Sequence, residues 1–264
     1  MKKNLTNNCF CLITGGTSGI GASFAFKLSE LGYNLLIVGN NKSKLIKTSN
    51  NIKNKFNNKV FAIQCDLSKE NSHKKIISVI KSKKLKIKFF IQSAGMGYYG
   101  KFTKSELSNN LKIIEINIKS IVSLSYFLVK HMMAHNDESY IVNIGSLSGF
   151  CPSPEMTVYS CSKNFIEKFS ECLNYELRKT NIQVSYIAPG QTKTGFLKNF
   201  GKKTDHKNSM TSDNVVKIAL KNILNKKTKI ITGHTNYIRY LLFKIIPNKI
   251  ILEYFYYKSI KNKQ

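Results

Sequence analysis

The chain alternates short apolar runs with longer segments in which apolar residues recur at helical spacing. Seven of these runs have the length of a β-strand, and each is almost continuously apolar rather than alternating. They are residues 9–14, 34–38, 60–64, 88–92, 140–144, 183–187 and 229–232. Continuous apolar strands separated by helices are typical of a parallel sheet covered on both faces. The pattern therefore predicts the α/β class, with a doubly wound, parallel, seven-stranded sheet and helices on both faces.

The segments between the strands supply the expected helices, at residues 19–31, 45–56, 72–81, 107–131, 160–179 and 213–225. Because no repeat or linker interrupts the series, we expect a single domain over residues 1–236. Residues 237–264 form a separate apolar, aromatic and basic extension. In sheets of this kind ligands bind beyond the carboxyl ends of the strands, so the loops there are the candidate sites.

The charge of the chain first suggests nucleic acid as a partner. Among 264 residues there are 42 Lys and Arg against 14 Asp and Glu, which makes the formal net charge +28, and 42% of the residues are hydrophobic. However, Arg178 and Arg239 are the only arginines, and the lysines are scattered along the chain. Proteins that read bases rely on the forked guanidinium of arginine. We therefore interpret the charge as a solvated basic surface and expect no specific nucleic-acid partner.

The six cysteines show neither a CxxC pair nor histidines at metal-ligand spacing. We expect reduced, mostly buried thiols and no metal. The apolar run near the N-terminus is short and ends in Thr14-Gly15-Gly16 without a small-residue cleavage site. It therefore indicates a first buried strand rather than a secretory signal, and a cytoplasmic protein.

A glycine-rich loop, TGGTSGIG at residues 14–21, joins the first expected strand to the first helix. Gly15, Gly19 and Gly21 permit a tight turn, close approach of a pyrophosphate and packing of the helix on the strand. The start of the helix offers unpaired N–H groups to the anion. The loop therefore predicts a dinucleotide site with contacts from Thr14, Gly15, Ser18, Gly19, Ile20 and Gly21.

The end of the second strand bears on the type of dinucleotide. An acidic residue there would select the free ribose hydroxyl of NAD, but the chain has Asn40 and Lys42 instead. Lys42 could neutralise a phosphate, so NADP is favoured and NAD remains possible; alternatively, Lys42 is an ordinary surface lysine. Asp66 and Leu67 follow the third strand, where Asp66 could accept a hydrogen bond from adenine or could cap a helix.

Tyr159 and Lys163 are four residues apart in an expected helix, so their side chains share one face. An ammonium near the phenol would lower the phenol's pKa from about 10 and prepare it to exchange a proton with a carbonyl. Ser146, after the fifth strand, would hydrogen-bond the same carbonyl oxygen.

These motifs occur together in one order: TGGTSGIG, Asp66-Leu67, Ala94-Gly95, Asn117, Ser146, Tyr159 with Lys163, and Pro189-Gly190. Over residues 8–233 the chain thus resembles the short-chain dehydrogenase/reductase family of the single-domain type. The resemblance implies a Rossmann-like fold and a homodimer or homotetramer. It implies that Tyr159 is the general acid/base, that Ser146 orients the carbonyl and that Lys163 also binds the nicotinamide ribose. Asn117 would hold a water in the proton relay, and the further residues bordering the cofactor would be Ala94, Gly95, Pro189, Gly190, Thr192 and Thr194.

The implied reaction is reversible hydride transfer between NADP(H) and a carbonyl or alcohol, with a hydrophobic ketone or acyl-type compound as substrate. Gln92 and Ser93 stand where the family has two asparagines, and Asn40 replaces a basic residue common in members that use NADP. Three alternatives remain. A non-catalytic sensor of the nicotinamide redox state would not need Ser146, Tyr159 and Lys163 together. A nucleic-acid-binding protein would show an arginine-rich strip, and a nucleotide-sugar epimerase would normally need a longer region after the sixth strand.

Two segments bear on substrate and location. Residues 195–213, with Phe196, Leu197, Phe200 and Met210, lie where a substrate lid is expected. The 237–264 extension is too charged to span a bilayer and is broken by Pro247. It either packs on the substrate cleft or a partner subunit, or lies on the inner face of a membrane, where its basic residues meet anionic lipid.

Overall fold

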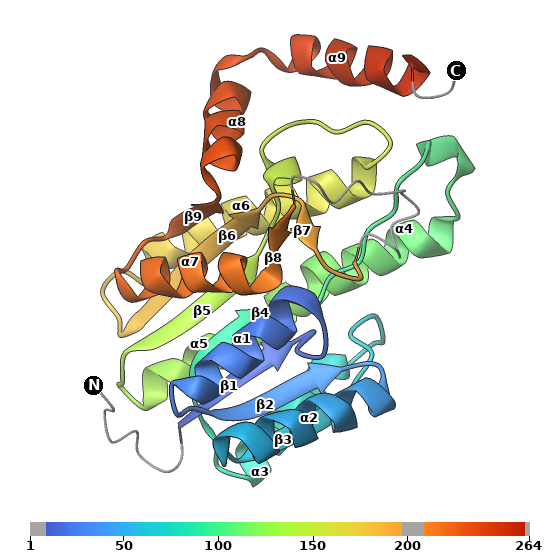
Figure 1. Cartoon of the computed structure of the whole chain (residues 1–264). Coiled ribbons are helices and arrows are strands. Elements are labelled where there is room, and N and C mark those ends of the chain that lie inside the picture. The colour runs from blue at the N-terminus through green and yellow to red at the C-terminus, as the bar shows by residue number, and fades with distance from the viewer. Residues whose placement is uncertain (1–8, 197–208, 262–264) are drawn as a thin grey trace.

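The computed structural model describes residues 9–196 and 209–261 (Figure 1). Its centre is a seven-stranded parallel sheet in the order β3-β2-β1-β4-β5-β6-β9. The predicted fold class is confirmed, and every predicted strand is present to within two residues at either end. The strands are β1 (Cys9–Thr14), β2 (Asn34–Gly39), β3 (Val60–Gln64), β4 (Lys86–Gln92), β5 (Ser139–Ile144), β6 (Ile182–Pro189) and β9 (Lys229–Thr232).

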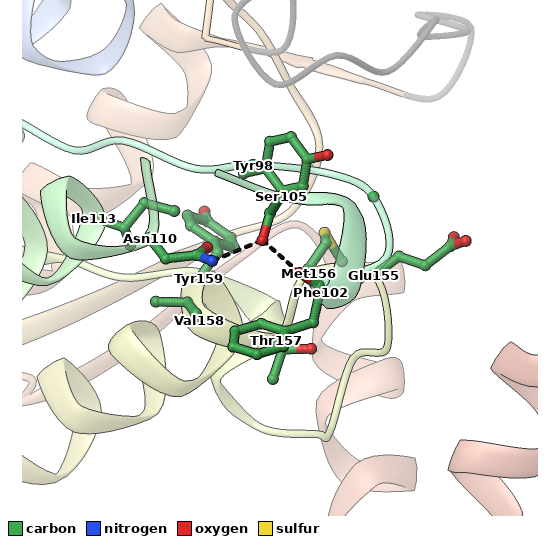
Figure 2. A pocket seen from close by; sticks show the side chains of 11 residues that line it. Tyr98, Phe102, Ser105, Asn110, Ile113, Glu155, Met156, Thr157, Val158 and Tyr159 are labelled. Atoms are coloured by element: carbon green, nitrogen blue, oxygen red, sulfur yellow. Dashed lines mark hydrogen bonds between the residues drawn. The ribbon is translucent and has the colours of Figure 1, made fainter. Parts of the chain in front are cut away.

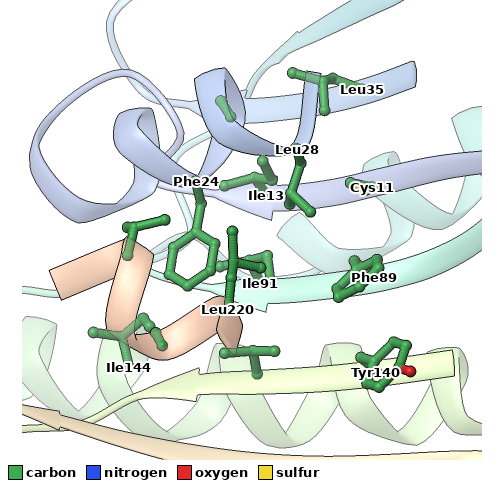
Figure 3. Packing of buried hydrophobic residues seen from close by; sticks show 14 of the residues in the cluster. Cys11, Ile13, Phe24, Leu28, Leu35, Phe89, Ile91, Tyr140, Ile144 and Leu220 are labelled. Atoms are coloured by element: carbon green, nitrogen blue, oxygen red, sulfur yellow. The ribbon is translucent and has the colours of Figure 1, made fainter. Parts of the chain in front are cut away.

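Helices cover both faces of the sheet, and each face has its own apolar core. On one face, α1 (Gly19–Glu30), α2 (Lys42–Phe56) and α7 (Ser212–Leu224) pack on alternate residues of the strands. Figure 3 shows this layer, in which Phe24 of α1 and Leu220 of α7 meet Ile13 and Ile91 of the sheet. The opposite face is covered by α3 (Ser72–Ser82), α5 (Ser120–Ala134) and α6 (Thr157–Glu176). Successive residues of a strand point to opposite faces of the sheet. Because both faces are covered by helices, the residues on each face must be apolar.

The predicted helix over residues 107–131 is interrupted. The chain forms α4 (Leu107–Ile114), then a π-helical turn at Glu115–Lys119, and then α5. Asn117, in the middle of this turn, is fully buried and hydrogen-bonds the backbone of Met96, which follows β4. Single π-helical turns within α-helices occur frequently at functional sites. The irregular turn thus occurs where Asn117 bonds a distant segment of the chain. The helical periodicity of the sequence contains no signal for this turn.

The strand order reverses between β1 and β4, which lie side by side although β2 and β3 separate them in the chain. The loops after these two strands meet at the sheet edge. A Cβ on Gly15, after β1, would lie 2.8 Å from the Cα and N atoms of Ala94, after β4. This is the position at which ligands bind in doubly wound sheets.

Beyond β9 the chain continues into α8 (His234–Ile245) and α9 (Asn248–Lys261), which project away from the sheet in Figure 1. As expected, Pro247 separates the two helices. Asn236 and Tyr240 of α8 are buried, and the ring centres of Tyr240 and Phe150 are 4.6 Å apart. Many large apolar side chains of this pair are exposed: Tyr237, Ile238, Leu241, Leu242, Ile245, Ile250, Leu252, Tyr254, Tyr256 and Tyr257.

Within residues 9–196 and 209–261, no helix is both long and apolar enough to cross a membrane. The expected domain boundary at residue 236 falls in the first turn of α8, and the division of the chain there stays a prediction. All six cysteines are free thiols, of which Cys9, Cys11, Cys65 and Cys151 are buried and Cys161 and Cys172 are exposed.

Candidate active site

Ser146, Tyr159 and Lys163 come together at the carboxyl end of β5. Ser146 follows that strand, and Tyr159 and Lys163 lie on the first turns of α6. The Tyr159 side chain, 8% exposed, shares a hydrogen bond with that of Ser146. The Lys163 Nζ lies 5.6 Å from the centre of the Tyr159 ring and donates a hydrogen bond of 2.9 Å to the backbone oxygen of Ile144. The predicted spacing thus places phenol, ammonium and hydroxyl in one buried group.

The expected lowering of the Tyr159 pKa is wrong for this structure. Burial raises the pKa of Tyr159 to about 12, and the hydrogen bond with Ser146 opposes that rise only in part. Burial also lowers the pKa of Lys163 to about 8. Loss of hydration is therefore the dominant effect on both groups. At neutral pH the phenol keeps its proton, which it can donate.

Asn117 approaches the same group from the π-helical turn. Its Nδ2 donates to the backbone oxygen of Met96 and to Ser162 Oγ, both at 2.9 Å, and its Oδ1 accepts from the Met96 N–H at 2.9 Å. Both amide hydrogens are thereby used. If Asn117 holds a water, its side chain can bind that water only by accepting a hydrogen bond at Oδ1. Otherwise the backbone of Asn117 would have to bind the water.

Gly95 faces this group across the site. A Cβ there would lie 3.5 Å from Asn117 Oδ1 and 3.6 Å from Lys163 Nζ. The loop after β4 therefore passes directly over two of the expected catalytic side chains.

The glycine loop has the backbone that its sequence predicts. Gly15 and Gly19 have φ angles of +66° and +51°, a region that favours glycine. Thr14 Oγ1 accepts a hydrogen bond from the Ala94 N–H, which ties this loop to the one after β4. Ser18 precedes α1 in an extended conformation and makes no side-chain cap to the helix. Its exposed hydroxyl and the first N–H groups of α1 are suited to a phosphate.

The expected adenosine side lies along β2 and β3. Asn40 and Lys42 are exposed after β2, and Asn41 between them caps α2 by accepting from the Lys44 N–H. A Cβ on Gly39 would lie 3.0 Å from a methyl carbon of Thr17, so this strand end adjoins the glycine loop.

The helix cap expected as an alternative role for Asp66 is wrong, because α3 begins at Ser72 with Asn71 at its N-cap position. Asp66 instead stabilises a turn at Ser68. Its Oδ1 accepts from both the N–H and the hydroxyl of Ser68, and its pKa is lowered, because these bonds and nearby lysines outweigh the effect of burial. The side chain of Leu67 is buried in the core. Leu67 could therefore contact a ligand only through its backbone.

The loop after β6 completes the edge of the site. Pro189 ends the strand, and a Cβ on Gly190 would lie 2.4 Å from Asn236 Nδ2 of α8. Thr192 begins β7 (Thr192–Lys193), which pairs with β8 (Met210–Thr211). The Thr194 methyl lies 2.9 Å from the place of a Cβ on Gly19, so this loop touches the glycine loop.

Within the described part of the expected lid, Phe196 reaches the site. Its ring centre lies 6.0 Å from that of Tyr159. Met210 lies in β8, near Gly233. The other two residues named for the lid, Leu197 and Phe200, lie outside the described residues.

A shallow depression that is open to solvent lies beside Tyr159 (Figure 2). Its apolar lining comes from the loop after β4, from α4 and from the start of α6, and its polar centre is the Asn110 Nδ2 to Ser105 Oγ hydrogen bond of 2.7 Å. Sequence reasoning missed this pocket because its lining residues other than Tyr159 belong to no motif. The signal available was the apolar and aromatic content of the strand-free loop over residues 93–106. Besides Tyr159, its lining residues are Tyr98, Gly100, Phe102, Ser105, Asn110, Ile113, Glu155, Met156, Thr157 and Val158.

These residues fit a nicotinamide dinucleotide. The positive φ angles of the glycine loop bring backbone N–H groups to the sheet edge, and the side-chain-free Gly95 leaves room in front of Lys163 and Asn117. A cofactor extended from Asn40 and Lys42 past residues 14–21 would end at Tyr159.

Residues 10–205 match the sequence model of the short chain dehydrogenases. The chain belongs to the short-chain dehydrogenase family. It is 33% identical over 256 residues to the very-long-chain 3-oxoacyl-CoA reductase of Rattus norvegicus, which covers 95% of this chain and 78% of that protein. It is 26% identical to sulfoacetaldehyde reductase 2 of Chromohalobacter salexigens, over 70% of this chain and 73% of that protein.

Among solved structures, the short-chain dehydrogenase from Sphingobium yanoikuyae in complex with NADPH is similar, with a TM-score of 0.80 and 27% identity. The match covers 85% of this chain and 88% of that one. Membership of the short-chain dehydrogenase family confirms the predicted class of enzyme, an NAD(P)-dependent oxidoreductase.

Proposed function

We propose that this short-chain dehydrogenase transfers a hydride between NADP(H) and a hydrophobic ketone or acyl-type carbonyl compound. The observation that carries the proposal is the hydrogen bond between Ser146 and the buried, protonated Tyr159, with Lys163 beside it. A carbonyl oxygen placed between Ser146 Oγ and Tyr159 Oη would meet two donors. Such a pair orients the carbonyl and stabilises the negative charge that develops on its oxygen.

In the direction of reduction, the proton comes from this chain. When bound, the nicotinamide supplies the hydride that the carbonyl carbon accepts. Tyr159 gives its hydroxyl proton to the carbonyl oxygen, and Ser146 holds that oxygen in place. Lys163 stabilises the resulting phenolate by its charge, and its own proton is held only loosely because burial lowers its pKa to about 8. Asn117 fixes the loop at Met96 through two hydrogen bonds and so keeps the nicotinamide side of the site in shape.

The preference for NADP rests on the end of β2. Asn40 and Lys42 are exposed there, next to the glycine loop, and neither would repel a ribose phosphate. The similar structure from Sphingobium yanoikuyae was solved with NADPH.

The hydrophobic nature of the substrate rests on the pocket beside Tyr159. Phe102, Ile113, Met156 and Val158 are among its lining residues, and the ring centre of Phe196 lies 6.0 Å from that of Tyr159. The rat relative is named for a 3-oxoacyl-CoA, whose carbonyl sits on an acyl chain. The bacterial relative is named for sulfoacetaldehyde, so we restrict the proposal to the class of compound.

A nicotinamide-binding sensor without chemistry is the alternative. It would keep the glycine loop and would gain nothing from burying an ammonium beside a phenol, which costs free energy. The grouping of Ser146, Tyr159 and Lys163 therefore favours catalysis.

The test is NADPH consumption with a panel of long-chain ketones, steroid ketones and 3-oxoacyl thioesters. Tyr159→Phe is expected to lower turnover at least about a hundredfold, which is the usual contribution of a positioned proton donor, while NADPH binding stays unchanged. Tyr175→Phe is the matched control, because Tyr175 lies on the same helix and is 67% exposed. Unchanged turnover in Tyr159→Phe, or binding of NADPH with no turnover of any carbonyl by the wild type, would overturn the proposal.

We further propose that α8 and α9 hold the enzyme on the surface of an anionic membrane at its cytoplasmic face. Exposed apolar side chains on both helices and the basic Arg239, Lys244 and Lys249 support this, since the combination is typical of helices that lie in the membrane interface. A homodimer or homotetramer also stays a prediction.

A further inference from the structure

Tyr186 of β6 bonds to both backbone groups of Ser146. Its hydroxyl donates to the Ser146 carbonyl oxygen at 3.0 Å and accepts from the Ser146 N–H at 3.2 Å. The side chain is 1% exposed. One buried hydroxyl therefore satisfies both the N–H and the carbonyl oxygen of Ser146.

These bonds continue the sheet where its ladder ends. The pairing of β5 with β6 runs as far as Ile144 opposite Ile187, and Gly145 N–H still donates to the Ile187 carbonyl at 2.8 Å. Ser146 lies one residue further on, where backbone groups need another partner if they are to be buried. The Tyr186 hydroxyl is that partner, so the strand end keeps a fixed conformation up to Ser146.

The glycines beside Ser146 make room for the ring. A Cβ on Gly145 would lie 2.1 Å from the nearest ring carbon of Tyr186, and a Cβ on Gly149 would lie 3.0 Å from its hydroxyl oxygen. Phe150 packs against the same ring, with centres 5.8 Å apart and planes at 81°. The loop over residues 145–150 is thus shaped around Tyr186, which has little freedom to move.

Fixing the backbone of Ser146 also fixes its side chain. The Oγ accepts a hydrogen bond of 3.2 Å from the Ser148 N–H and shares the bond with Tyr159. A functional side chain held by its own loop is only as well placed as the backbone that supports it. Burial raises the pKa of Tyr186 far above its usual value, so its hydroxyl keeps its proton and remains a donor at neutral pH.

We propose that Tyr186 is a positioning residue: it holds the backbone of Ser146 so that Ser146 Oγ stays aimed at Tyr159 and at the carbonyl oxygen of the substrate. The inference rests on the proposed function only for the role of Ser146. The anchoring of the Ser146 backbone by Tyr186 can be measured without substrate.

The first measurement is amide hydrogen exchange over residues 145–149 in the full chain. Tyr186→Phe keeps the ring and removes both hydrogen bonds, so exchange at Ser146 is expected to accelerate about tenfold or more, as the loss of a buried bond implies. Tyr140→Phe is the matched control. Tyr140 is also buried, but it lies near the start of β5 and its hydroxyl bonds Glu138. Equal exchange in wild type and Tyr186→Phe would overturn the proposal.

The second measurement is a double-mutant cycle in turnover. Tyr186→Phe is expected to lower kcat about tenfold while KM for NADPH is unchanged, and Tyr140→Phe to leave both unchanged. In a Ser146→Ala background, Tyr186→Phe should have almost no further effect on kcat. An equal loss in both backgrounds would show a merely structural role and would overturn the proposal. If the wild type turned over no carbonyl, the proposed function would fail, whereas hydrogen exchange would still decide whether Tyr186 anchors Ser146.

Discussion

The ammonium nitrogen of Lys163 lies 5.6 Å from the centre of the Tyr159 ring, and its hydrogen bond goes to the Ile144 carbonyl rather than to a carboxylate. The lysine is 5% exposed, and burial lowers its pKa to about 8. Keeping this charge buried costs free energy of folding.

Lys163→Met should therefore stabilise the protein at pH 7. The lysine binds its proton more weakly in the folded chain than in the unfolded one, so its burial is costly below pH 8. The cost is lost as the pH rises from 8 to the unfolded pKa near 10.4. It amounts to about 3 kcal/mol, from which the lost bond to Ile144 subtracts about 1 kcal/mol.

Urea unfolding at pH 7 and at pH 10 measures this difference. We expect the variant to be roughly 2 kcal/mol more stable than the wild type at pH 7, with a smaller gap at pH 10, and to have lost turnover. A wild type more stable than Lys163→Met at pH 7 would contradict the argument.

Gly15→Ala tests the glycine loop. The φ angle of +66° disfavours a side chain, and the new Cβ would meet the Ala94 backbone at 2.8 Å. We expect a loss of about 1–3 kcal/mol in the free energy of unfolding, together with weaker NADPH binding. Gly195→Ala is the control, since a Cβ there meets nothing within 4 Å, and it should change stability by less than about 0.5 kcal/mol. Similar effects of the two substitutions, measured by urea unfolding and by NADPH fluorescence titration, would speak against the predicted role.

The sequence was enough to predict the sheet because each strand is buried on both faces, and a run such as residues 34–38 has few other uses. The spacing of Tyr159 and Lys163 likewise fixed their common helix face. The π-helical turn around Asn117, the bonds of Tyr186 to Ser146 and the pocket at Ser105 and Asn110 arise from contacts between distant segments. Local patterns do not encode such contacts. The expected lowering of the Tyr159 pKa was wrong for a related reason. Burial of Tyr159 raises this pKa, and the depth of burial depends on the whole fold.

Lys42→Glu tests the choice of cofactor. If Lys42 contacts the ribose phosphate, reversing its charge should weaken NADPH binding roughly tenfold, which corresponds to about 1.4 kcal/mol, and leave NADH binding unchanged. Lys53→Glu makes the same change in net charge near the other end of α2 and is the control. Dissociation constants for both cofactors, measured by fluorescence at one ionic strength, give the answer. If both substitutions weakened NADPH binding equally, Lys42 would be an ordinary surface lysine that makes no specific contact with the phosphate.

Sedimentation with lipid vesicles tests the α8–α9 pair. We expect the full chain to pellet with vesicles containing anionic phosphatidylglycerol, less so with neutral ones, and less at high salt. The truncation should be made after Ile246, because Tyr240 packs on Phe150 and a shorter chain would disturb the loop that carries Ser146. Removing α9 takes away Ile250, which is 59% exposed, and four more exposed apolar side chains, so binding should fall at least about tenfold.

Two substitutions in the full chain separate membrane binding from the alternatives. Ile245→Ser removes a side chain of α8 that is 79% exposed, and Leu224→Ser, at the end of α7 with 51% exposure, is the matched control. Only the first should reduce pelleting, because only α8 and α9 form the proposed membrane face. Suppose that neither the full chain nor the truncated chain pelleted with vesicles, and that the truncated chain sedimented in the ultracentrifuge as a smaller oligomer than the full chain. The exposed face of α8 and α9 would then belong to a subunit interface instead. The free energy of burying these side chains would then stabilise the assembly rather than a complex with lipid.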